Sequence, residues 1–243
     1  DRMGDTFVVA DKRQDRVAEL KDRYGVDTAT NTEAAREADV VVLVVKPQDI
    51  FTVVDEIAGD LKPTALVVSL AAGVTTASLE ALLPDGIPVV RVMPNTPALV
   101  DEGMSAVSPG AHCTPEHVAL AVRLMACVGK VVEVPEKMQD AVTAISGSGP
   151  AYIFYTVEAM IEAGVGLGLP RRLATELTLQ TVYGAATMLR ETGEHPVVLR
   201  ENVTSPAGTT AAALRVLEDH KVRAAFLSAL EAARNRSVEL AEG

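Results

Sequence analysis

The chain has 243 residues, a formal net charge of −11 at pH 7, 48% hydrophobic residues and no tryptophan. This length allows one large domain or two small ones with a sizeable core. The acidic balance and the lack of a lysine- or arginine-rich cluster argue against a nucleic-acid partner. No apolar run reaches the roughly 18 residues of a membrane span. The first residues do not form a signal peptide and only two cysteines occur, Cys113 and Cys127, so we expect a cytoplasmic protein without a disulfide. The four histidines are scattered, and we expect no metal site.

The first half of the chain alternates apolar runs with helical patterns. Apolar runs over residues 40–45, 65–70 and 87–93 begin 25 and 22 residues apart, which is an interval typical of βαβ crossovers. Continuous apolar runs predict strands that are buried on both faces. We therefore expect a doubly wound parallel sheet. Further strands are predicted over 6–10, 104–107 and 131–134, and helices over 13–24, 50–57, 79–83 and 115–128.

The second half has a different character. No strand pattern occurs from residue 140 onward, and the segments 151–163 and 174–189 are apolar nearly all round. Helices of this kind must be buried on all faces, and residues 136–243 are too few to enclose two of them. We therefore expect a Rossmann-like dinucleotide-binding domain over 1–135 and an all-α dimerisation and substrate domain over 136–243. The chain would form a homodimer or a higher assembly of dimers.

A Rossmann fold opens with a strand, a glycine-rich turn and a helix, and its second strand ends in an acidic residue that binds the adenosine ribose. Asp11 follows the run over 6–10 and matches that acidic residue. We accordingly expect this chain to be truncated, without the first strand and its glycine turn. Asp11 can equally be the N-cap of the next helix. Asp11 favours NADH and the neighbouring Lys12 and Arg13 favour NADPH, so both cofactors stay open.

The segment from Asn202 to Thr210 is small, polar and glycine-containing, and it precedes an apolar helical run. The first N–H groups of a helix have no partner within it, and the helix dipole favours an anion there. Ser205, Thr209 and Thr210 add hydroxyl donors. The segment predicts a site for a carboxylate or a phosphate, and the alternative is an ordinary capped loop.

Five segments in order resemble pyrroline-5-carboxylate reductase. They are VVKPQ (44–48), SLAAGV (69–74), RVMPNTP (91–97), AISGSGPAY (144–152) and NVTSPAGTT (202–210). The resemblance implies an oxidoreductase that reduces 1-pyrroline-5-carboxylate to L-proline, the last step of proline biosynthesis, with a hydride from NADPH or NADH. A protonated imine is already an electrophile, so orientation of two bound reactants would do most of the work. This agrees with the lack of an obvious His/Asp or Cys/His constellation.

The resemblance also implies residue roles. Thr210 would be catalytic, with its hydroxyl at the ring nitrogen of the substrate. Ser205, Gly208, Thr209 and Thr210 would bind the substrate, and Glu136 would line its pocket. The implied cofactor residues are Asp11, Asn31, Val44, Val45, Lys46, Pro47, Leu70, Ala71, Ala72 and Asn202. Besides Asp11, four of the assignments have plainer alternatives: Asn31 as a helix cap, Lys46 as a solvated loop lysine, Glu136 as a surface glutamate and Thr210 as an ordinary residue at a helix start.

Two other functions compete with this one. A related β-hydroxyacid or imine reductase would place a lysine on the long helix, and residues 151–163 contain none. A folded, dimerising but inactive chain is the second alternative.

Overall fold

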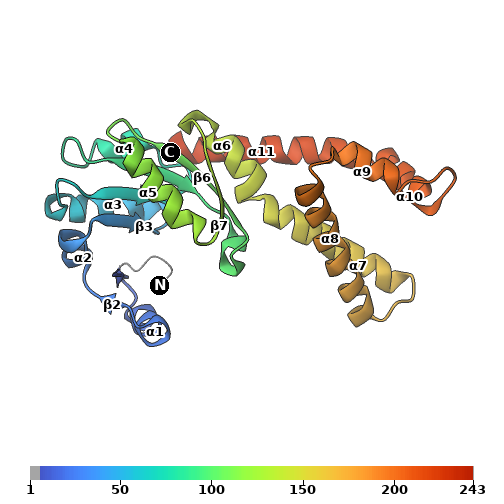
Figure 1. Ribbon diagram of the computed structural model, residues 1–243, viewed down its shortest axis with the longest axis horizontal. Helices are drawn as coiled ribbons and strands as arrows, with labels where there is room; N and C mark the ends of the chain where they lie inside the picture. Colours follow the sequence, from blue (N-terminus) through green and yellow to red (C-terminus); the bar gives the residue numbers. More distant parts are fainter. Residues whose placement is uncertain (1–5, 243) are drawn as a thin grey trace. The chain divides into compact units, whose positions relative to one another are not determined.

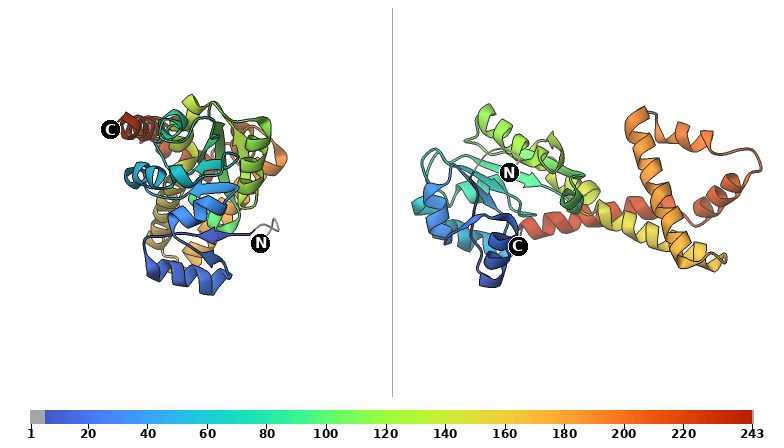
Figure 2. Two further views of the ribbon diagram at one scale, coloured as in Figure 1. Left: turned by 90° about the vertical axis from the view of Figure 1, so that its left-hand side faces the viewer. Right: turned by 60° about the horizontal axis from the view of Figure 1, so that its bottom comes forward.

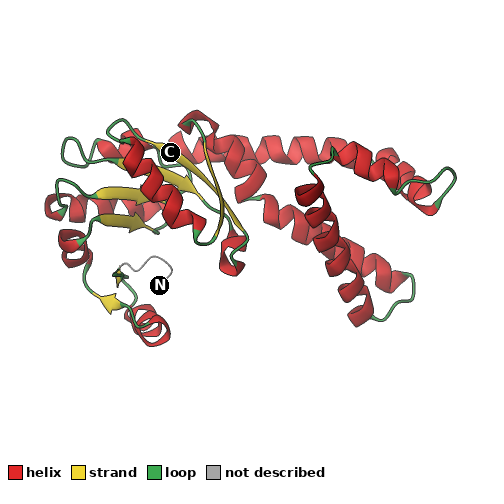
Figure 3. Cartoon of the chain, viewed as in Figure 1, coloured by secondary structure: helices red, strands yellow, loops and turns green. Residues whose placement is uncertain are grey.

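The computed structural model of the chain describes residues 6–242, which divide into two units (Figure 1). The first unit holds the residues up to 147 together with those from 233 onward, and the second holds residues 148–232. Within the described chain, strands occur only in the first unit and the second unit is helical (Figure 3). The domain boundary that we expect after residue 135 stays a prediction.

The centre of the first unit is a five-stranded sheet with the strand order β3-β4-β5-β6-β7. The β3–β4 and β4–β5 pairs are parallel, as the spacing of the apolar runs predicts. β6 is antiparallel to β5 and parallel to β7. The strands are β3 (Val40–Leu43), β4 (Leu66–Ser69), β5 (Val89–Met93), β6 (Gly103–Pro109) and β7 (Gly129–Glu133).

The antiparallel β5–β6 pair is a departure from the parallel pairing of the rest of this sheet. A parallel connection needs a crossover of about a dozen residues or more, usually with a helix. Residues 94–102 between these strands are too few, and they contain only the short 3-10 helix η2 (Thr96–Val100). The chain therefore turns back beside β5, and β6 extends the sheet in the opposite direction.

Helices cover both faces of the five-stranded sheet. One face packs against α2, α3 and α4, and the other packs against α5. In α3 the buried side chains are Ile50, Val54 and Ile57, a helical spacing that puts one apolar stripe against the sheet. Burial of each such side chain contributes about 1.5–3 kcal/mol. The helices of this unit include α2 (Asn31–Glu37), α3 (Pro47–Ile57), α4 (Thr76–Glu80), α5 (Pro115–Ala126) and α6 (Gln139–Val142), with the short turns η1 (Ala58–Asp60), η3 (Glu136–Met138) and η4 (Thr143–Gly147).

Strand β3 and helix α4 differ from the predictions. The sequence predicts that β3 is buried on both faces, as β4 is, but Val42 of β3 is 44% exposed. β3 is an edge strand of the described sheet, so its side chains have neighbours on one side only. Helix α4 starts before the predicted residue 79, because the Thr75 hydroxyl accepts the Ser78 N–H (3.2 Å) and begins the helix there.

The N-terminal strand lies outside the five-stranded sheet. β1 (Val8–Val9) pairs in parallel with β2 (Asp27–Thr28), and α1 (Gln14–Tyr24) connects them. Within residues 6–242 no strand ladder joins this pair to the other sheet. The strand predicted over 6–10 is therefore shorter than expected, and it belongs to a small sheet of its own.

The second unit consists of helices, of which α7 and α8 pack against each other. A Cβ added to Gly164 would lie 3.0 Å from the Ala174 Cβ, so a small residue is required at this crossing. Gly168 has a φ of 94° and lies in the turn after α7, as the run of glycines predicts. The helices are α7 (Gly149–Gly166), α8 (Arg171–Thr192), α9 (Pro196–Asn202), α10 (Thr209–Asp219) and the first half of α11 (Val222–Glu242), and Figure 2 shows them from two further sides.

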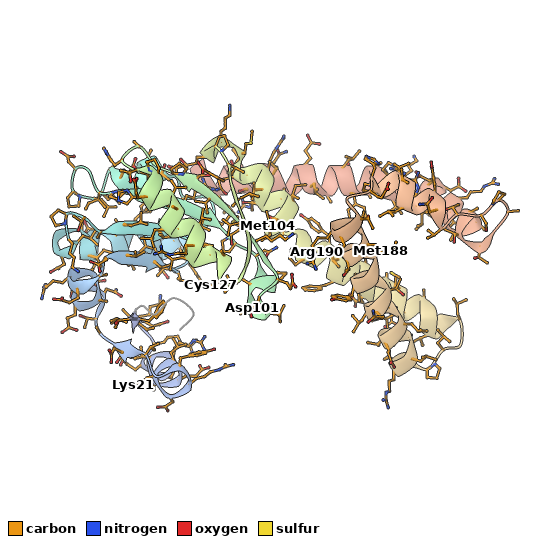
Figure 4. The ribbon with its side chains drawn as sticks, viewed as in Figure 1. Lys21, Asp101, Met104, Cys127, Met188 and Arg190 are labelled. Carbon is orange, nitrogen blue, oxygen red and sulfur yellow. The ribbon has the colours of Figure 1, made fainter. Side chains whose placement is uncertain are left out.

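The α7–α8 pair leaves large apolar side chains uncovered in a single chain. Phe154 is 64% exposed, Tyr155 75% and Tyr183 65%. Met188, labelled on α8 in Figure 4, is also exposed. Large apolar side chains exposed on a packed helix pair suit a protein–protein contact. Within residues 6–242, no helix has the length and hydropathy needed to cross a bilayer.

We expect Phe154→Asp to shift the chain toward monomers, because a carboxylate buried in a helix interface without a partner is costly. Light scattering on the purified chain would measure the change. Tyr24→Asp makes a matched change at an exposed aromatic residue of α1 in the first unit, and it should leave the mass unchanged. A monomeric unmutated chain would contradict this interpretation.

Candidate active site

Two loops meet at the carboxyl edge of β3 and β4. The parallel register places Leu43 opposite Ser69, so the residues that follow the two strands lie at the same edge. The Leu70 N–H donates to the Leu43 carbonyl over 3.0 Å and ties these ends together. This edge brings together the predicted cofactor residues Val44, Val45, Lys46, Pro47, Leu70, Ala71 and Ala72.

The surface of this edge combines apolar, small and cationic groups. Val44 is 73% exposed, Lys46 is exposed and Ala72 is half-buried. Lys46 is the N-cap of α3, so a lysine stands at the start of this helix, where the first N–H groups have no partner within the helix. An exposed apolar patch beside a cation and a helix start suits the ring and the phosphates of a dinucleotide. Residues 6–242 contain no group of three or more His, Cys, Asp or Glu side chains arranged to hold a metal ion.

The acidic residue after β1 is held in a local turn. Asp11 Oδ1 accepts the Arg13 backbone N–H over 2.8 Å. Arg13 is the N-cap of α1, so the alternative that Asp11 caps this helix is wrong. Lys12 Nζ lies 3.1 Å from Asp49 Oδ2 in the first turn of α3. Arg13 pairs with Asp15, which lowers the pKa of that carboxyl. Both cations next to Asp11 therefore already have carboxylate partners.

Asn31 is the first residue of α2 and does not cap it. Thr30 is the N-cap, and it forms a capping box with Glu33. The Thr30 N–H and hydroxyl donate to the Glu33 carboxylate and lower its pKa. The capping alternative for Asn31 is therefore wrong. Asn31 Nδ2 instead donates to Glu56 Oε2 of α3 over 2.8 Å.

The turn between α9 and α10 is fixed by its own hydrogen bonds. Asn202 is the last residue of α9 and its side chain is exposed. The Thr204 N–H donates to the Glu201 carbonyl (2.9 Å), and the Thr204 hydroxyl donates to the Arg200 carbonyl (2.6 Å). These bonds hold the chain against the last turn of α9 before it enters α10.

The start of α10 presents donors that nothing in its own unit uses. Its N-cap is Gly208, and no side chain caps the helix. Gly208 N–H donates to the Ser205 carbonyl (3.0 Å), and a Cβ added to Gly208 would collide with Ser205 Oγ. Ala207 between them has a φ of 56°, in the left-handed region. Within residues 6–242 no hydrogen bond involves the hydroxyls of Ser205, Thr209 or Thr210, and Thr210 is the half-buried one of the three.

Glu136 lies in η3 of the first unit and has three partners there. Its Oε1 accepts the Thr76 N–H (2.8 Å), and its Oε2 accepts the Thr76 hydroxyl (2.7 Å). Arg91 Nη1 lies 3.4 Å from Glu136 Oε1. The side chain of Glu136 is 25% exposed, so it is neither an ordinary surface glutamate nor fully buried. Its predicted position in the substrate pocket stays a prediction.

Comparison with known proteins identifies the family. Residues 136–240 match the family described as pyrroline-5-carboxylate reductase dimerisation, and residues 2–73 match NADP oxidoreductase coenzyme F420-dependent. A pyrroline-5-carboxylate reductase of Corynebacterium melassecola is 50% identical over 236 residues, which cover 96% of this chain and 87% of the relative. This chain belongs to the pyrroline-5-carboxylate reductase family.

Solved structures agree with this assignment. A pyrroline-5-carboxylate reductase of Coxiella burnetii is 43% identical, with a TM-score of 0.88 over 96% of this chain and 87% of its own. A Plasmodium falciparum pyrroline carboxylate reductase with NADP bound is 31% identical, with a TM-score of 0.86 over 97% of this chain and 87% of its own. The predicted family, the Rossmann-like fold with a helical dimerisation domain and the NAD(P)H-dependent reductase class are confirmed. The related β-hydroxyacid or imine reductase is excluded.

Sequence reasoning assigned no role to two polar side chains of the first unit that hold its segments together. Arg91 is 4% exposed in β5. Its position as a charged residue inside an apolar run could have indicated a buried and paired side chain. Asn95 accepts the Met104 N–H (2.8 Å) and donates to the Ser146 carbonyl (3.1 Å). Figure 4 labels Met104 on β6. Asn95 thus joins three segments of the first unit, and nothing local in its sequence indicates these partners.

Proposed function

We propose that this pyrroline-5-carboxylate reductase binds its substrate at the turn from Ser205 to Thr210. The reaction is the reduction of 1-pyrroline-5-carboxylate to L-proline with NAD(P)H. The observation that carries the assignment of this site is the start of α10, where an uncapped helix N-terminus and three hydroxyls without intramolecular partners lie together in the described chain.

The substrate presents a carboxylate and a ring nitrogen, and the turn offers donors for both. The first N–H groups of α10, at Thr209 and Thr210, suit the carboxylate, and the helix dipole favours its charge. Gly208 keeps the backbone accessible, because a side chain there would displace the Ser205 hydroxyl. The half-buried Thr210 hydroxyl is our choice for the partner of the ring nitrogen. It donates a hydrogen bond or a proton there while the imine carbon is reduced.

The carboxyl edge of β3 and β4 is our proposed cofactor site. When bound, NAD(P)H supplies the hydride that reduces the C=N bond. Val44, Val45, Lys46 and Pro47 from one loop and Leu70, Ala71 and Ala72 from the other would hold it. Asp11 and Asn31 would bind its adenosine half, and Asn202 its nicotinamide half.

We also infer a cytoplasmic homodimer. The uncovered apolar side chains of α7 and α8 and the match to a dimerisation family support self-association. Cys113 and Cys127 form no disulfide in the described chain. Burial raises the pKa of the Cys113 thiol, which donates to the Val89 carbonyl. A half-buried free cysteine that donates to the backbone is compatible with a reducing compartment.

Thr210→Val keeps the side-chain shape and removes the hydroxyl. If that hydroxyl meets the ring nitrogen mainly in the transition state, kcat and kcat/KM fall together. The loss of one such hydrogen bond costs about 1–3 kcal/mol, roughly a ten- to hundredfold fall in rate. Steady-state kinetics on the full natural protein would measure it.

Thr209→Val is the matched control for this test. It makes the same chemical change one residue earlier, at an exposed position whose proposed contact is through the backbone. We expect near-normal kcat for Thr209→Val. An unchanged kcat for Thr210→Val would remove Thr210 from the mechanism and leave the turn as a carboxylate-binding device.

The Lys12–Asp49 ion pair generates a prediction about cofactor preference. Asp49→Asn releases Lys12 from its carboxylate partner, so its cation becomes available to a 2′-phosphate. We expect the ratio of kcat/KM for NADPH over NADH to rise roughly two- to fivefold, the range of an exposed ion pair, and the rise to shrink at high salt. Asp22→Asn on α1 changes the net charge equally and is the control. Equal effects on both cofactors would contradict a role for Lys12 near the 2′-position.

A further inference from the structure

Three buried polar side chains cross the sheet of the first unit in one row. Ser69 of β4 is the register partner of Arg91 of β5, and Arg91 is the partner of Ser108 of β6. Register partners on neighbouring strands point to the same face of a sheet. Ser69, Arg91 and Ser108, here called the polar row, are each at most 4% exposed. The neighbouring strand positions are apolar, so the polar row is a seam inside an apolar core.

The charge of the polar row is balanced by Glu136. Arg91 Nη1 lies 3.4 Å from Glu136 Oε1, whereas Arg91 Nη2 has no hydrogen-bond partner in the described chain. Replacement of a buried ion pair by apolar side chains often leaves stability unchanged or raises it. A buried arginine with only one of its terminal nitrogens paired is therefore poorly explained by stability alone.

The other bonds of Glu136 hold the start of α4. Its two oxygens accept the N–H and the hydroxyl of Thr76, and Thr76 is 4% exposed. Hydrogen bonds to a carboxylate are shorter and stronger than those between neutral groups. Glu136 therefore ties the first residue of α4 to the middle of β5 through Arg91.

Thr76 ends the segment that carries part of the proposed cofactor site. Residues 70–76 leave β4 at Ser69, whose hydroxyl accepts the Ala71 N–H (3.4 Å). Gly73 turns the segment with a φ of 76°, and Val74 is buried within it. Both ends of the segment are thus bonded to the polar row. Ala71 at its beginning bonds to Ser69, and Thr76 at its end bonds to Glu136, which pairs with Arg91.

We propose that Arg91 and Glu136 are positioning residues that set the backbone of residues 70–76 for dinucleotide binding. This inference rests on the proposed cofactor role of Leu70, Ala71 and Ala72. It gives Glu136 a role in holding the cofactor loop. The family resemblance implies a different role for Glu136, in the substrate pocket. Arg91 and Glu136 act through Thr76, and they need no contact of their own with the cofactor.

Glu136→Gln and Thr76→Val test the proposal in the full natural protein. The first variant places an amide NH₂ against donors, and the second removes one of the two donors on Thr76. We expect KM and Kd for NADPH to rise about ten- to hundredfold, the effect of one charge-assisted bond. The kcat and the KM for 1-pyrroline-5-carboxylate should change by less than about twofold. Quenching of NADPH fluorescence gives the Kd directly.

Ser108→Ala is the matched control. Ser108 belongs to the polar row, but its hydroxyl donates to the Val134 carbonyl and accepts a hydrogen bond from Gln139 Nε2, both over 2.7 Å. The variant disturbs the same buried seam without touching residues 70–76. We expect it to lower the melting temperature and to leave the cofactor KM unchanged. If Ser108→Ala raises the cofactor KM equally, general destabilisation would explain the rise seen with Glu136→Gln and Thr76→Val, and the proposal would be overturned.

Three other outcomes also decide the question. A rise in the KM for 1-pyrroline-5-carboxylate alone would place Glu136 in the substrate pocket and overturn the positioning role.

Ala72→Leu distinguishes a failure of the positioning role from a failure of the proposed cofactor site on which that role rests. If Ala72→Leu leaves NADPH binding unchanged, the cofactor role of the segment fails and the positioning role fails with it. If Ala72→Leu weakens NADPH binding and Thr76→Val does not, only the positioning role fails. Thr76→Val decides the matter if Glu136→Gln does not fold.

Discussion

The parallel register of β3, β4 and β5 is the constraint on which the first unit depends. Because Leu43, Ser69 and Arg91 are in register, the loops that leave β3 and β4 share one edge, and Arg91 lies beside the end of β4. A slip of β5 by one residue would turn Arg91 to the opposite face, where α5 and an apolar cluster pack. The buried guanidinium would then lose its carboxylate, at a cost of about 3–5 kcal/mol. The same register that aligns the cofactor edge is therefore enforced by a buried charge.

The second unit depends instead on self-association to cover its apolar side chains. No residue of α7 is fully buried within one chain, although its sequence is apolar nearly all round. The side chains that would stabilise this unit are thus available for contacts with another copy. The proposed substrate turn belongs to the same unit, and its geometry comes from short local bonds such as those of Thr204 and Gly208. Those bonds shape the turn, whereas α9 and α10, which flank it, have no fully buried residue in the single chain.

Local features were predictable from the sequence and long-range ones were not. The apolar run of β4 and the glycine stop after α7 are encoded in a few adjacent residues, and so is the helix start after Gly208. The edge position of β3 and the reversed direction of β6 depend on strand order, which no single run contains. Thr76 and Glu136 are 60 residues apart in sequence, so neither residue type indicates the other. Arg91 alone left a visible signal, as a charge inside an apolar strand, and its meaning becomes clear only when Glu136 is seen beside it.

Long-range polar contacts that hold loops in place agree with the chemistry of the reaction. A protonated imine needs no strong base, so the enzyme contributes mainly by holding two reactants in the correct geometry. An error of about 1 Å in that geometry can lower the rate a hundredfold. Backbone segments that bind reactants must therefore be held in place, and hydrogen bonds from polar side chains are one way to hold a loop. In this chain Asn95 fastens the segment after β5, and Glu136 fastens the start of α4. The half-buried side chains of Asn95 and Glu136 therefore act on the protein's own backbone, as the positioning of two reactants requires.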